Sequence, residues 1–389
     1  MTMIVLEAPA ADPVAEPIFT PTTLALSGLM VAAMSGFYLL LSAVPAHVAT
    51  LGGDFAAGLA TSALMATTIA GELLAPRLIA RFGRHSAMAA ALLVLALPCL
   101  TSFSDSLMLA LLSCATRGLG LGVLLVAACG LAAALAPPTR RAEALGIYGV
   151  ASAIPAILCV PLGAWSLAEF GSTAVALVAA ASTSAGLACL AILPGRSARP
   201  ESAHPHCLPA LRGAIWPSAS LALGAIVVGA TVTFLPLAHR EVDSGTIMLA
   251  LLVQGLTSAI ARWVAGRPVD RHGPQGPMIL GIVLAVCAIL VLACTGSVAV
   301  LVGMALSGVA FGILQSASLA QLLSRATENQ ADGASAVWNA AYDAGLGLGG
   351  LVFGALAATT GYAAAFVASG ASLAALAFLA FHLFEARRS

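Results

Sequence analysis

Two related stretches of the sequence decide the fold that we expect. The first, ELLAPRLIARFG at residues 72–83, returns in the second half of the chain as RWVAGRPVDRHG at residues 262–273. Each copy follows a long apolar run and ends in arginines and a glycine, as expected where a helix leaves a membrane. A chain that repeats this arrangement is predicted to have two related halves, each made of membrane-spanning helices.

The composition of the chain excludes a soluble protein. Of its 389 residues, 60% are hydrophobic and 8% are charged, with a mean hydropathy of +1.03. A soluble domain has about 45–50% apolar and about 25% charged residues. The 16 cationic residues, all arginine, balance 16 acidic ones, and this zero net charge excludes a nucleic-acid-binding surface.

The same composition argues against a bound cofactor or metal. Without lysine the chain has no nucleotide-binding loop of the GxxxxGK type, which excludes ATP-driven transport by this chain alone. His204, His206 and Cys207 lie together in a polar loop, but they provide no fourth ligand for a metal ion. We therefore expect no cofactor and no metal site.

The apolar windows predict an all-α membrane protein with twelve transmembrane helices in two pseudo-symmetric six-helix bundles. Turn residues such as Gly52-Gly53 and Pro137-Pro138 separate the helices. The predicted helices span residues 22–46, 55–79, 86–103, 106–135, 142–167, 172–193, 213–238, 245–266, 276–295, 298–323, 333–358 and 361–384. In this division residues 1–21 are a disordered tail, 22–193 the first bundle, 194–212 a linker and 213–389 the second bundle.

The arginines lie almost entirely on one side of the predicted helices. Thirteen of the 16 fall in the loops and tail of that side, whereas the opposite loops carry Arg240 and several acidic residues. Positively charged loops stay in the cytoplasm. We therefore expect a monomeric, multi-pass protein of the bacterial inner membrane, surrounded by lipid, with both termini and the linker in the cytoplasm.

The repeated stretch resembles the pattern G-x-x-x-D-R-x-G-R-R of the major facilitator superfamily. The copy at 262–273 keeps its Gly, Asp, Arg and second Gly, whereas the copy at 72–83 has Pro76 for the Gly and Ala80 for the Asp. The resemblance implies two parallel six-helix repeats that give alternating access to a central site. It also implies gating positions at Arg81, Gly83, Arg84, Gly266, Asp270, Arg271 and Gly273.

Other stretches are similar to proton-driven exporters of this superfamily. NAAYDAGLG at residues 339–347 resembles the D-x-G-x-G stretch of small bacterial sugar and metabolite exporters. Pro155 and VPLG at residues 160–163 resemble a reduced G-P-x-x-G-G motif. Cys114 stands where the family usually has an arginine, and Arg117 lies on nearly the same helix face as a substitute.

Four ionisable side chains fall inside predicted helices, where a charge costs about 2.5 kcal/mol or more and suggests a function. Asp343, about 15 Å into its helix, is predicted to exchange protons, with a structural acid as the alternative. Glu72 is the second proton-coupling candidate, or else the permanent partner of Arg117. Arg262 is expected to reach the membrane surface or a gate contact rather than the substrate.

Six polar or aromatic side chains are candidates for substrate binding, each with core packing as the alternative. They are Phe37, Tyr38, Gln254, Gln315, Trp338 and Asn339. One central acid, one arginine and few aromatics favour a polar or zwitterionic substrate over a lipophilic cation.

The sequence thus predicts a secondary active transporter rather than an enzyme. The expected activity is proton-coupled efflux of a small polar organic molecule, such as a sugar, an amino-acid derivative, a siderophore-like metabolite or a drug. An importer or facilitator is the alternative within transport, and a non-transporting membrane sensor is the alternative outside it. The predicted helices lack the metal spacing or Ser/His arrangement of an intramembrane enzyme.

Overall fold

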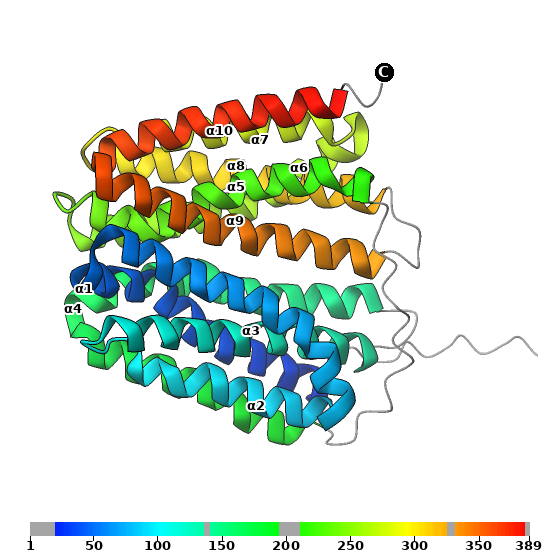
Figure 1. Cartoon of the computed structure of the whole chain (residues 1–389). Helices are drawn as coiled ribbons and strands as arrows, with labels where there is room; N and C mark the ends of the chain where they lie inside the picture. The colour runs from blue at the N-terminus through cyan, green and yellow to red at the C-terminus, as the bar shows by residue number, and fades with distance from the viewer. Residues whose placement is uncertain (1–19, 136–140, 194–210, 325–330, 386–389) are drawn as a thin grey trace, which may run out of the picture.

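The computed structural model describes residues 20–135, 141–193, 211–324 and 331–385, and this part of the chain is all-helical (Figure 1). It contains ten α-helices and one 3₁₀ helix, with no β-strand among the described residues. They are α1 (Pro21–Phe82), α2 (Arg84–Ala96), η1 (Leu97–Thr101), α3 (Leu107–Leu135), α4 (Arg141–Ile192), α5 (Leu211–Ala238), α6 (Ser244–His272), α7 (Gln275–Val291), α8 (Ser297–Leu323), α9 (Ala331–Thr360) and α10 (Tyr362–Glu385). The predicted fold class, an all-α membrane protein, is confirmed in this respect.

Two of these helices contain a sharp turn at a predicted break. In α1 the backbone leaves helical geometry at Gly52 and at Gly53, whose φ is +72°. In α4 it does so at Gly171, whose φ is +78°. Positive φ is readily adopted by glycine alone, so these residues allow the chain to reverse without a loop. The count of ten helices treats each of these bent elements as one.

Length and hydropathy make nine of the described helices long and apolar enough to cross a membrane. The helix α7 is also apolar but has only 17 residues. About 20 apolar residues span the hydrocarbon core of a bilayer. The fold is therefore that of a multi-pass membrane protein.

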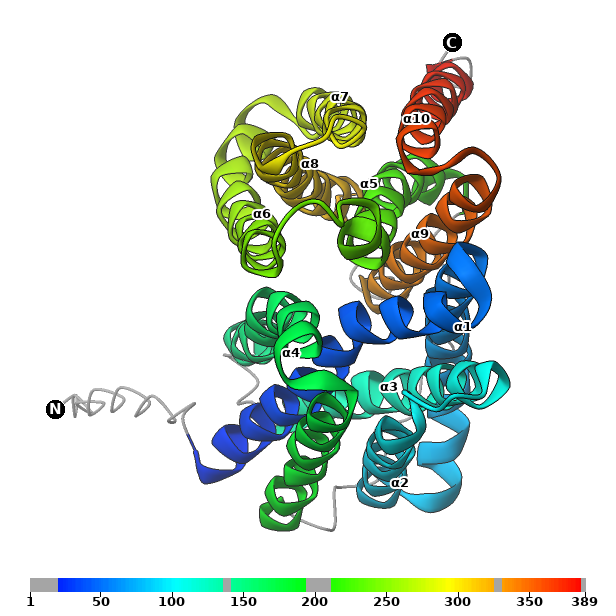
Figure 2. The same ribbon diagram turned by 90° about the vertical axis from the view of Figure 1, so that its left-hand side faces the viewer.

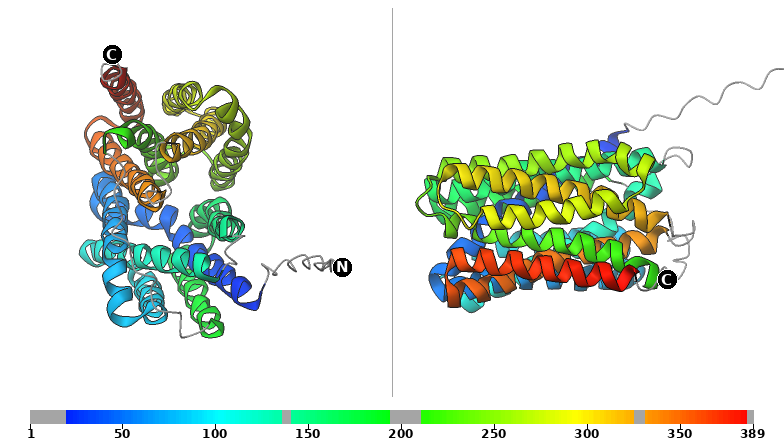
Figure 3. Two further views of the ribbon diagram at one scale, coloured as in Figure 1. Left: turned by 90° about the vertical axis from the view of Figure 1, so that its right-hand side faces the viewer. Right: turned by 90° about the horizontal axis from the view of Figure 1, so that it is seen from above.

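The helices run side by side in two groups. Figure 1 shows that α1 begins and α10 ends at one end of the bundle, which we call the termini end. The bends within α1 and α4 and the connection from α9 to α10 lie at the opposite end. Seen along the bundle, α1 to α4 form one group and α5 to α10 the other (Figure 2, and from other directions in Figure 3). The groups meet where α1 contacts α9 and α5, and where α4 contacts α6.

The packing of helices recurs at the same interval as the sequence repeat. A Cβ at Gly122 of α3 would collide with the Thr68 carbonyl of α1, and a Cβ at Gly312 of α8 would collide with the Ser258 carbonyl of α6. Small residues let membrane helices approach this closely. An equivalent glycine thus brings two helices together once in each group.

The two copies of the repeated stretch also end alike. Gly83 has a φ of +82° and donates its N–H to Ile79 (2.9 Å), while Gly273 has a φ of +81° and donates to Val269 (3.0 Å). Each glycine ends a helix and turns the chain into the next one, α2 or α7. This turn explains why the stretch needs glycine at these positions.

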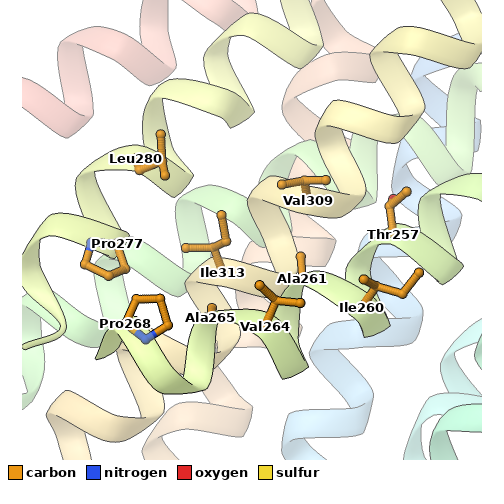
Figure 4. A pocket seen from close by; sticks show the side chains of 10 residues that line it. All are labelled: Thr257, Ile260, Ala261, Val264, Ala265, Pro268, Pro277, Leu280, Val309 and Ile313. Atoms are coloured by element: carbon orange, nitrogen blue, oxygen red, sulfur yellow. The ribbon is translucent and has the colours of Figure 1, made fainter. Parts of the chain in front are cut away.

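An apolar groove of about 550 Å³ lies between α6, α7 and α8 (Figure 4). Its lining is Thr257, Ile260, Ala261, Val264, Ala265, Pro268, Pro277, Leu280, Val309 and Ile313. The Thr257 hydroxyl already donates to the Val253 carbonyl (2.8 Å). None of the predicted site residues lines this groove, and its chemistry suits contact with hydrocarbon.

Candidate functional site

The site is built around Asp343, which lies in the first half of α9. Its side chain is 8% exposed, and no described residue donates a hydrogen bond to its carboxyl group. Buried carboxyl groups normally have a partner. Asp343 is therefore a polar group held inside the bundle without a local structural role among the described residues.

Glu72 is the second acid within an apolar helix, and its side chain is half-buried in α1, in the other helix group. Gly354 of α9 packs against the Asp54 carbonyl next to the turn of α1, so the turn at Gly361 lies seven residues beyond that level. Asp343 therefore lies nearer the opposite end of the bundle than Glu72 does.

Contacts between α1 and α9 establish that these helices run antiparallel and side by side. The backbone at Gly58 packs against the Gly350 carbonyl with no room for a Cβ. One turn further, the Ser62 hydroxyl donates to the Gly347 carbonyl (2.6 Å). Continuing this register toward the termini end places Asp343 beside the turn of α1 that follows Met65, before Glu72 is reached. The Glu72 carboxyl group is still within electrostatic range of Asp343.

Three tyrosines lie within electrostatic range of one or the other acid. The carboxyl group of Asp343 acts electrostatically on Tyr38 and Tyr342, and that of Glu72 acts on Tyr148. Tyr342 stacks on Phe311 of α8 (ring centroids 5.6 Å apart). The Tyr148 hydroxyl donates to the Leu125 carbonyl (3.3 Å). We call the five residues Tyr38, Glu72, Tyr148, Tyr342 and Asp343 the acid–tyrosine cluster.

Sequence reasoning missed Tyr148 and Tyr342. The available signal was scarcity, since the chain has only four tyrosines and three of them stand in apolar helices near a candidate acid. Tyr342 even adjoins Asp343 in sequence. Because adjacent helix residues point about 100° apart, adjacency alone did not predict that both would face the same neighbours.

The alternative pairing of Glu72 with Arg117 is not found among the described residues, where no ion pair joins them. Arg117 is fully buried inside the first helix group, where its Nη2 donates to the Phe37 carbonyl (3.2 Å) and acts electrostatically on Cys99 and Cys114. Its Nε and Nη1 have no hydrogen-bond partner. The guanidinium also lies over the Phe37 ring, 5.9 Å from its centroid.

Arg262 holds the position in α6 that corresponds to Glu72 in α1. Its side chain is exposed, and its carbonyl accepts a hydrogen bond from Ser316 (2.6 Å). That Arg262 reaches the membrane surface or a gate contact rather than the substrate stays a prediction. It forms no ion pair with a described residue.

The predicted substrate contacts are dispersed. Tyr38 belongs to the acid–tyrosine cluster, and Phe37 lies beside it with ring centroids 5.0 Å apart. Trp338 donates its Nε1–H to Ser318 (3.0 Å) and packs in the core. The other three candidates differ in exposure: Gln254 is buried, Gln315 half-buried and Asn339 exposed.

The gating positions lie at the termini end. Arg81 and Arg271 are exposed in the last turns of α1 and α6. Arg84 is half-buried at the start of α2, and its Nε has no hydrogen-bond partner. Gly266 lies in α6 with open space around it. The side chain of Asp270 lies outside the described part of the chain.

Hydrogen bonds between the two helix groups lie toward the opposite end. Tyr362 donates to Asp54 (2.6 Å), and the hydroxyls of Thr61 and Thr233 are 2.9 Å apart. Near the tip of the bundle Ser244 donates to Glu169 (3.2 Å). Together with the Ser62 contact these bonds join the groups at that end. Within the described residues no hydrogen bond joins them on the termini side of the acid–tyrosine cluster.

Metal chemistry has little support in this part of the chain. Over the described ranges no three His, Cys, Asp or Glu side chains lie together as a metal site would require. The cluster therefore offers two carboxyl groups, phenol hydroxyls and aromatic rings to a ligand or a proton.

Solved structures of transporters have the same fold. The nucleoside transporter NupG is 14% identical, with a TM-score of 0.76 over 93% of this chain and 100% of that one. A bacterial homologue of the lysosomal transporter Spinster, inward-facing and unoccupied, is 15% identical, with a TM-score of 0.76 over 95% and 97%. The peptide transporter POT in complex with sulfate is 13% identical, with a TM-score of 0.76 over 93% and 94%.

At the level of sequence, a search of curated proteins found none that matches the chain. The family model of the Major Facilitator Superfamily, however, matches residues 26–349 and 221–389. The matches cover nearly the whole chain, and the structural neighbours are transporters of this fold. The resemblance seen in the repeated stretch is thereby confirmed, and the protein is a transporter and not an enzyme: the chain belongs to the Major Facilitator Superfamily.

Proposed function

We propose that this protein is a secondary active transporter that couples proton movement to efflux of a small organic molecule by alternating access. The observation that carries the proposal is the buried carboxyl group of Asp343 in α9, the helix that contacts α1 of the other group, with Glu72 of α1 in its electrostatic range. Ionisable residues inside a membrane bundle are costly and mark ion or substrate pathways. Two carboxyl groups on contacting helices of different groups can bind a proton or a substrate in turn.

The proposed topology has twelve crossings. Counting α1 and α4 as two crossings each, at the turns of Gly53 and Gly171, gives six crossings in each half. The halves then comprise residues 22–193 and 213–389, joined by the linker 194–212. The recurrence of equivalent glycine packing in the two halves supports this division. The arginine distribution supports cytoplasmic termini in a bacterial inner membrane.

The described conformation supports a gate at the end opposite the termini. Every hydrogen bond between the helix groups in the described residues lies on that side of the cluster. Because the proposed topology puts the termini end in the cytoplasm, these hydrogen bonds close the site to the outside. Opening would require these bonds to break while the other end closes, through the stretches that contain Arg81 and Arg271.

Efflux rather than uptake is favoured by the VPLG stretch at residues 160–163 of α4, which resembles exporters. Its Gly163 lets α4 pack directly onto the Leu39 carbonyl of α1. An importer or a facilitator remains the alternative, and flux measurements distinguish the two.

The test uses the full chain reconstituted in proteoliposomes with an imposed pH gradient. A panel of labelled nucleosides, dipeptides, sugars and small organic cations is screened for accumulation. We expect at least one compound to accumulate against its own gradient when protons flow across the membrane in the opposite direction. Its accumulation should stop when a protonophore is added. Accumulation that ignores the pH gradient would contradict proton coupling, and accumulation only with cotransported protons would make the protein an importer.

A further inference from the structure

We propose that the groove between α6, α7 and α8 binds one phospholipid with an anionic headgroup, whose acyl chain lies in the groove and whose phosphate is held at the last turn of α6. The inference concerns a surface of the second helix group and does not depend on which substrate is transported. It rests on the lining of the groove, on its length and on the charges at one end of it.

The lining of the groove suits a hydrocarbon chain and no polar ligand. Both α6 and α7 pack on α8, which forms the floor between them (Figure 4). Nine of the ten lining residues have no polar side-chain atom, and the exception is Thr257. Its hydroxyl is already bonded to the Val253 carbonyl (2.8 Å) and lies 3.2 Å from the Ala305 carbonyl. A ligand in the groove therefore makes apolar contacts.

The rim of the groove is open to the surroundings of the protein. Ile260, Val264 and Leu280 are apolar, yet they are 59%, 54% and 51% exposed. In a multi-pass membrane protein such side chains face the hydrocarbon core of the bilayer. An acyl chain can thus enter the groove from the side.

The length of the groove matches one leaflet. Along α6 its lining runs from Thr257 to Pro268, eleven residues further on, or about 16 Å at 1.5 Å per residue. The hydrocarbon core of a bilayer is about 30 Å thick, so one leaflet accounts for about 15 Å. A chain that enters at Pro268 would end near Thr257.

Positive charges lie at the end of the groove near the turn at Gly273. Pro268 of α6 and Pro277 of α7 line that end, five residues before the turn and four after it. One turn beyond Pro268, on nearly the same helix face, α6 ends in Arg271 and His272, both exposed. Arginine binds phosphate well, and basic pockets between transmembrane helices on the cytoplasmic side bind anionic headgroups.

The related stretch of the first half provides a comparison. There Leu78 takes the place of Pro268, and its side chain is half-buried against the core, whereas Pro268 is exposed. Arg81 takes the place of Arg271 and is likewise exposed. The first half thus keeps the arginine but has a leucine packed on the core where the groove of the second half begins.

The charges favour a lipid over a second copy of the chain. Copies inserted in one membrane share one orientation, because the same arginines direct each of them. A second copy would therefore bring its own arginine-rich end to the level of Arg271. An anionic lipid brings a phosphate to that level instead.

The binding test uses the full chain in detergent and native mass spectrometry. The probes are phosphatidylglycerol and phosphatidylcholine with the same palmitoyl and oleoyl chains, so that they differ only in the headgroup. We expect one phosphatidylglycerol to bind about fivefold more tightly than phosphatidylcholine. Glycerol 3-phosphate, which carries a phosphate without acyl chains, should not displace it.

Two pairs of variants test the two ends of the lipid separately. Arg271→Gln should weaken phosphatidylglycerol binding about fivefold, a change of about 1 kcal/mol, whereas Arg81→Gln, the same change at the related position, should not. Val264→Trp fills the groove and should weaken binding about tenfold, through the lost burial of the chain. Val283→Trp, on α7 outside the groove and equally exposed (53% against 54%), is its control.

The unfolding temperature of each variant is measured first, and if Val264→Trp does not fold, the Arg271 pair and the two headgroups decide the test. The inference is overturned if phosphatidylcholine binds as tightly as phosphatidylglycerol, if glycerol 3-phosphate displaces the lipid, or if the groove variants bind lipid as their controls do. A dimer that Val264→Trp breaks would also overturn it, because a second copy would then fill the groove. These measurements need no transported substrate, so their outcome is separate from that of the flux test.

Discussion

Glu72 and Asp343 lie on antiparallel, contacting helices of different helix groups, within electrostatic range of each other. The register between these helices is set nearer the opposite end, where Gly58 packs on Gly350 and Ser62 bonds to Gly347. Relative movement of the two groups would therefore change the separation of the acids directly. This relationship links the packing of the bundle to its proposed coupling of protons and substrate.

The repeated glycine packing predicts matched effects on stability. Gly122→Ala and Gly312→Ala should each destabilise the protein by about 1–3 kcal/mol, because the added methyl meets a carbonyl of the neighbouring helix. Gly149→Ala is the control, since open space surrounds this helical glycine. Thermal unfolding in detergent measures all three, and equal midpoints for Gly122→Ala and Gly149→Ala would refute the close approach.

The bond from Tyr362 to Asp54 predicts a shift of the conformational equilibrium. Tyr362→Phe removes a hydrogen bond to a half-exposed carboxylate, worth about 1.5 kcal/mol, and should populate the outward-open state about tenfold more. The readout is labelling of Met65→Cys, which lies behind this closure, by an impermeant maleimide in a background without native cysteines. Thr359→Ala, whose hydroxyl bonds only within its own helix, is the control. Slower or unchanged labelling in Tyr362→Phe would be inconsistent with a gate at this end.

The cap of α6 predicts a pH-dependent contribution to stability. The hydroxyl and the backbone N–H of Thr246 donate to Asp243 (2.6 and 2.9 Å), and these bonds hold the pKa of Asp243 below its ordinary value of 3.8. A lowered pKa means that the ionised cap stabilises the folded state above the ordinary value, and that this stabilisation is lost as the pH falls through the lowered pKa. Asp243→Ala should thus lower the unfolding temperature at neutral pH and lose its effect in strong acid. A difference that persists unchanged in strong acid would argue against the ionised cap.

The arginine distribution predicts the orientation in the membrane. Reporter fusions after Arg199 and after Ser389 should be active only with a cytoplasmic reporter, because thirteen of the 16 arginines lie on that side. Activity of a periplasmic reporter at either position would reverse the proposed topology, and with it the assignment of the closed end to the outside.

Sequence patterns predicted much of this fold, because membrane-spanning helices are long apolar runs separated by turn residues. The breaks at Gly53, Gly83 and Gly171 were predictable, since each needs a positive φ that glycine adopts at no steric cost. The repeat of the stretch at 72–83 likewise anticipated the equivalent packing of Gly122 and Gly312. Such features depend on local sequence or on simple periodicity.

The site was predicted only in part, because it depends on which way side chains point across helix interfaces. Asp343 and Glu72 stood out as acids in apolar helices, and their separate depths were calculable. Their relative position depends on the Gly58–Gly350 register, which no local pattern contains. Arg117 was another charge in an apolar helix, and its hydrogen bond to the Phe37 carbonyl was not predictable from spacing. Tyr148 joined the cluster only through the packing of α4.

The most direct measurement of the central claim is flux through Asp343→Asn in proteoliposomes, with the substrate found by the screen. Asn resembles the protonated carboxyl group and cannot release a proton. We predict that Asp343→Asn loses accumulation driven by a pH gradient while retaining part of the exchange of substrate down its own gradient, and that Asp105→Asn, which neutralises an exposed loop carboxylate, keeps both. If Asp343→Asn accumulates substrate in a pH gradient as well as the wild type does, Asp343 does not couple proton movement to transport and the proposed mechanism is wrong.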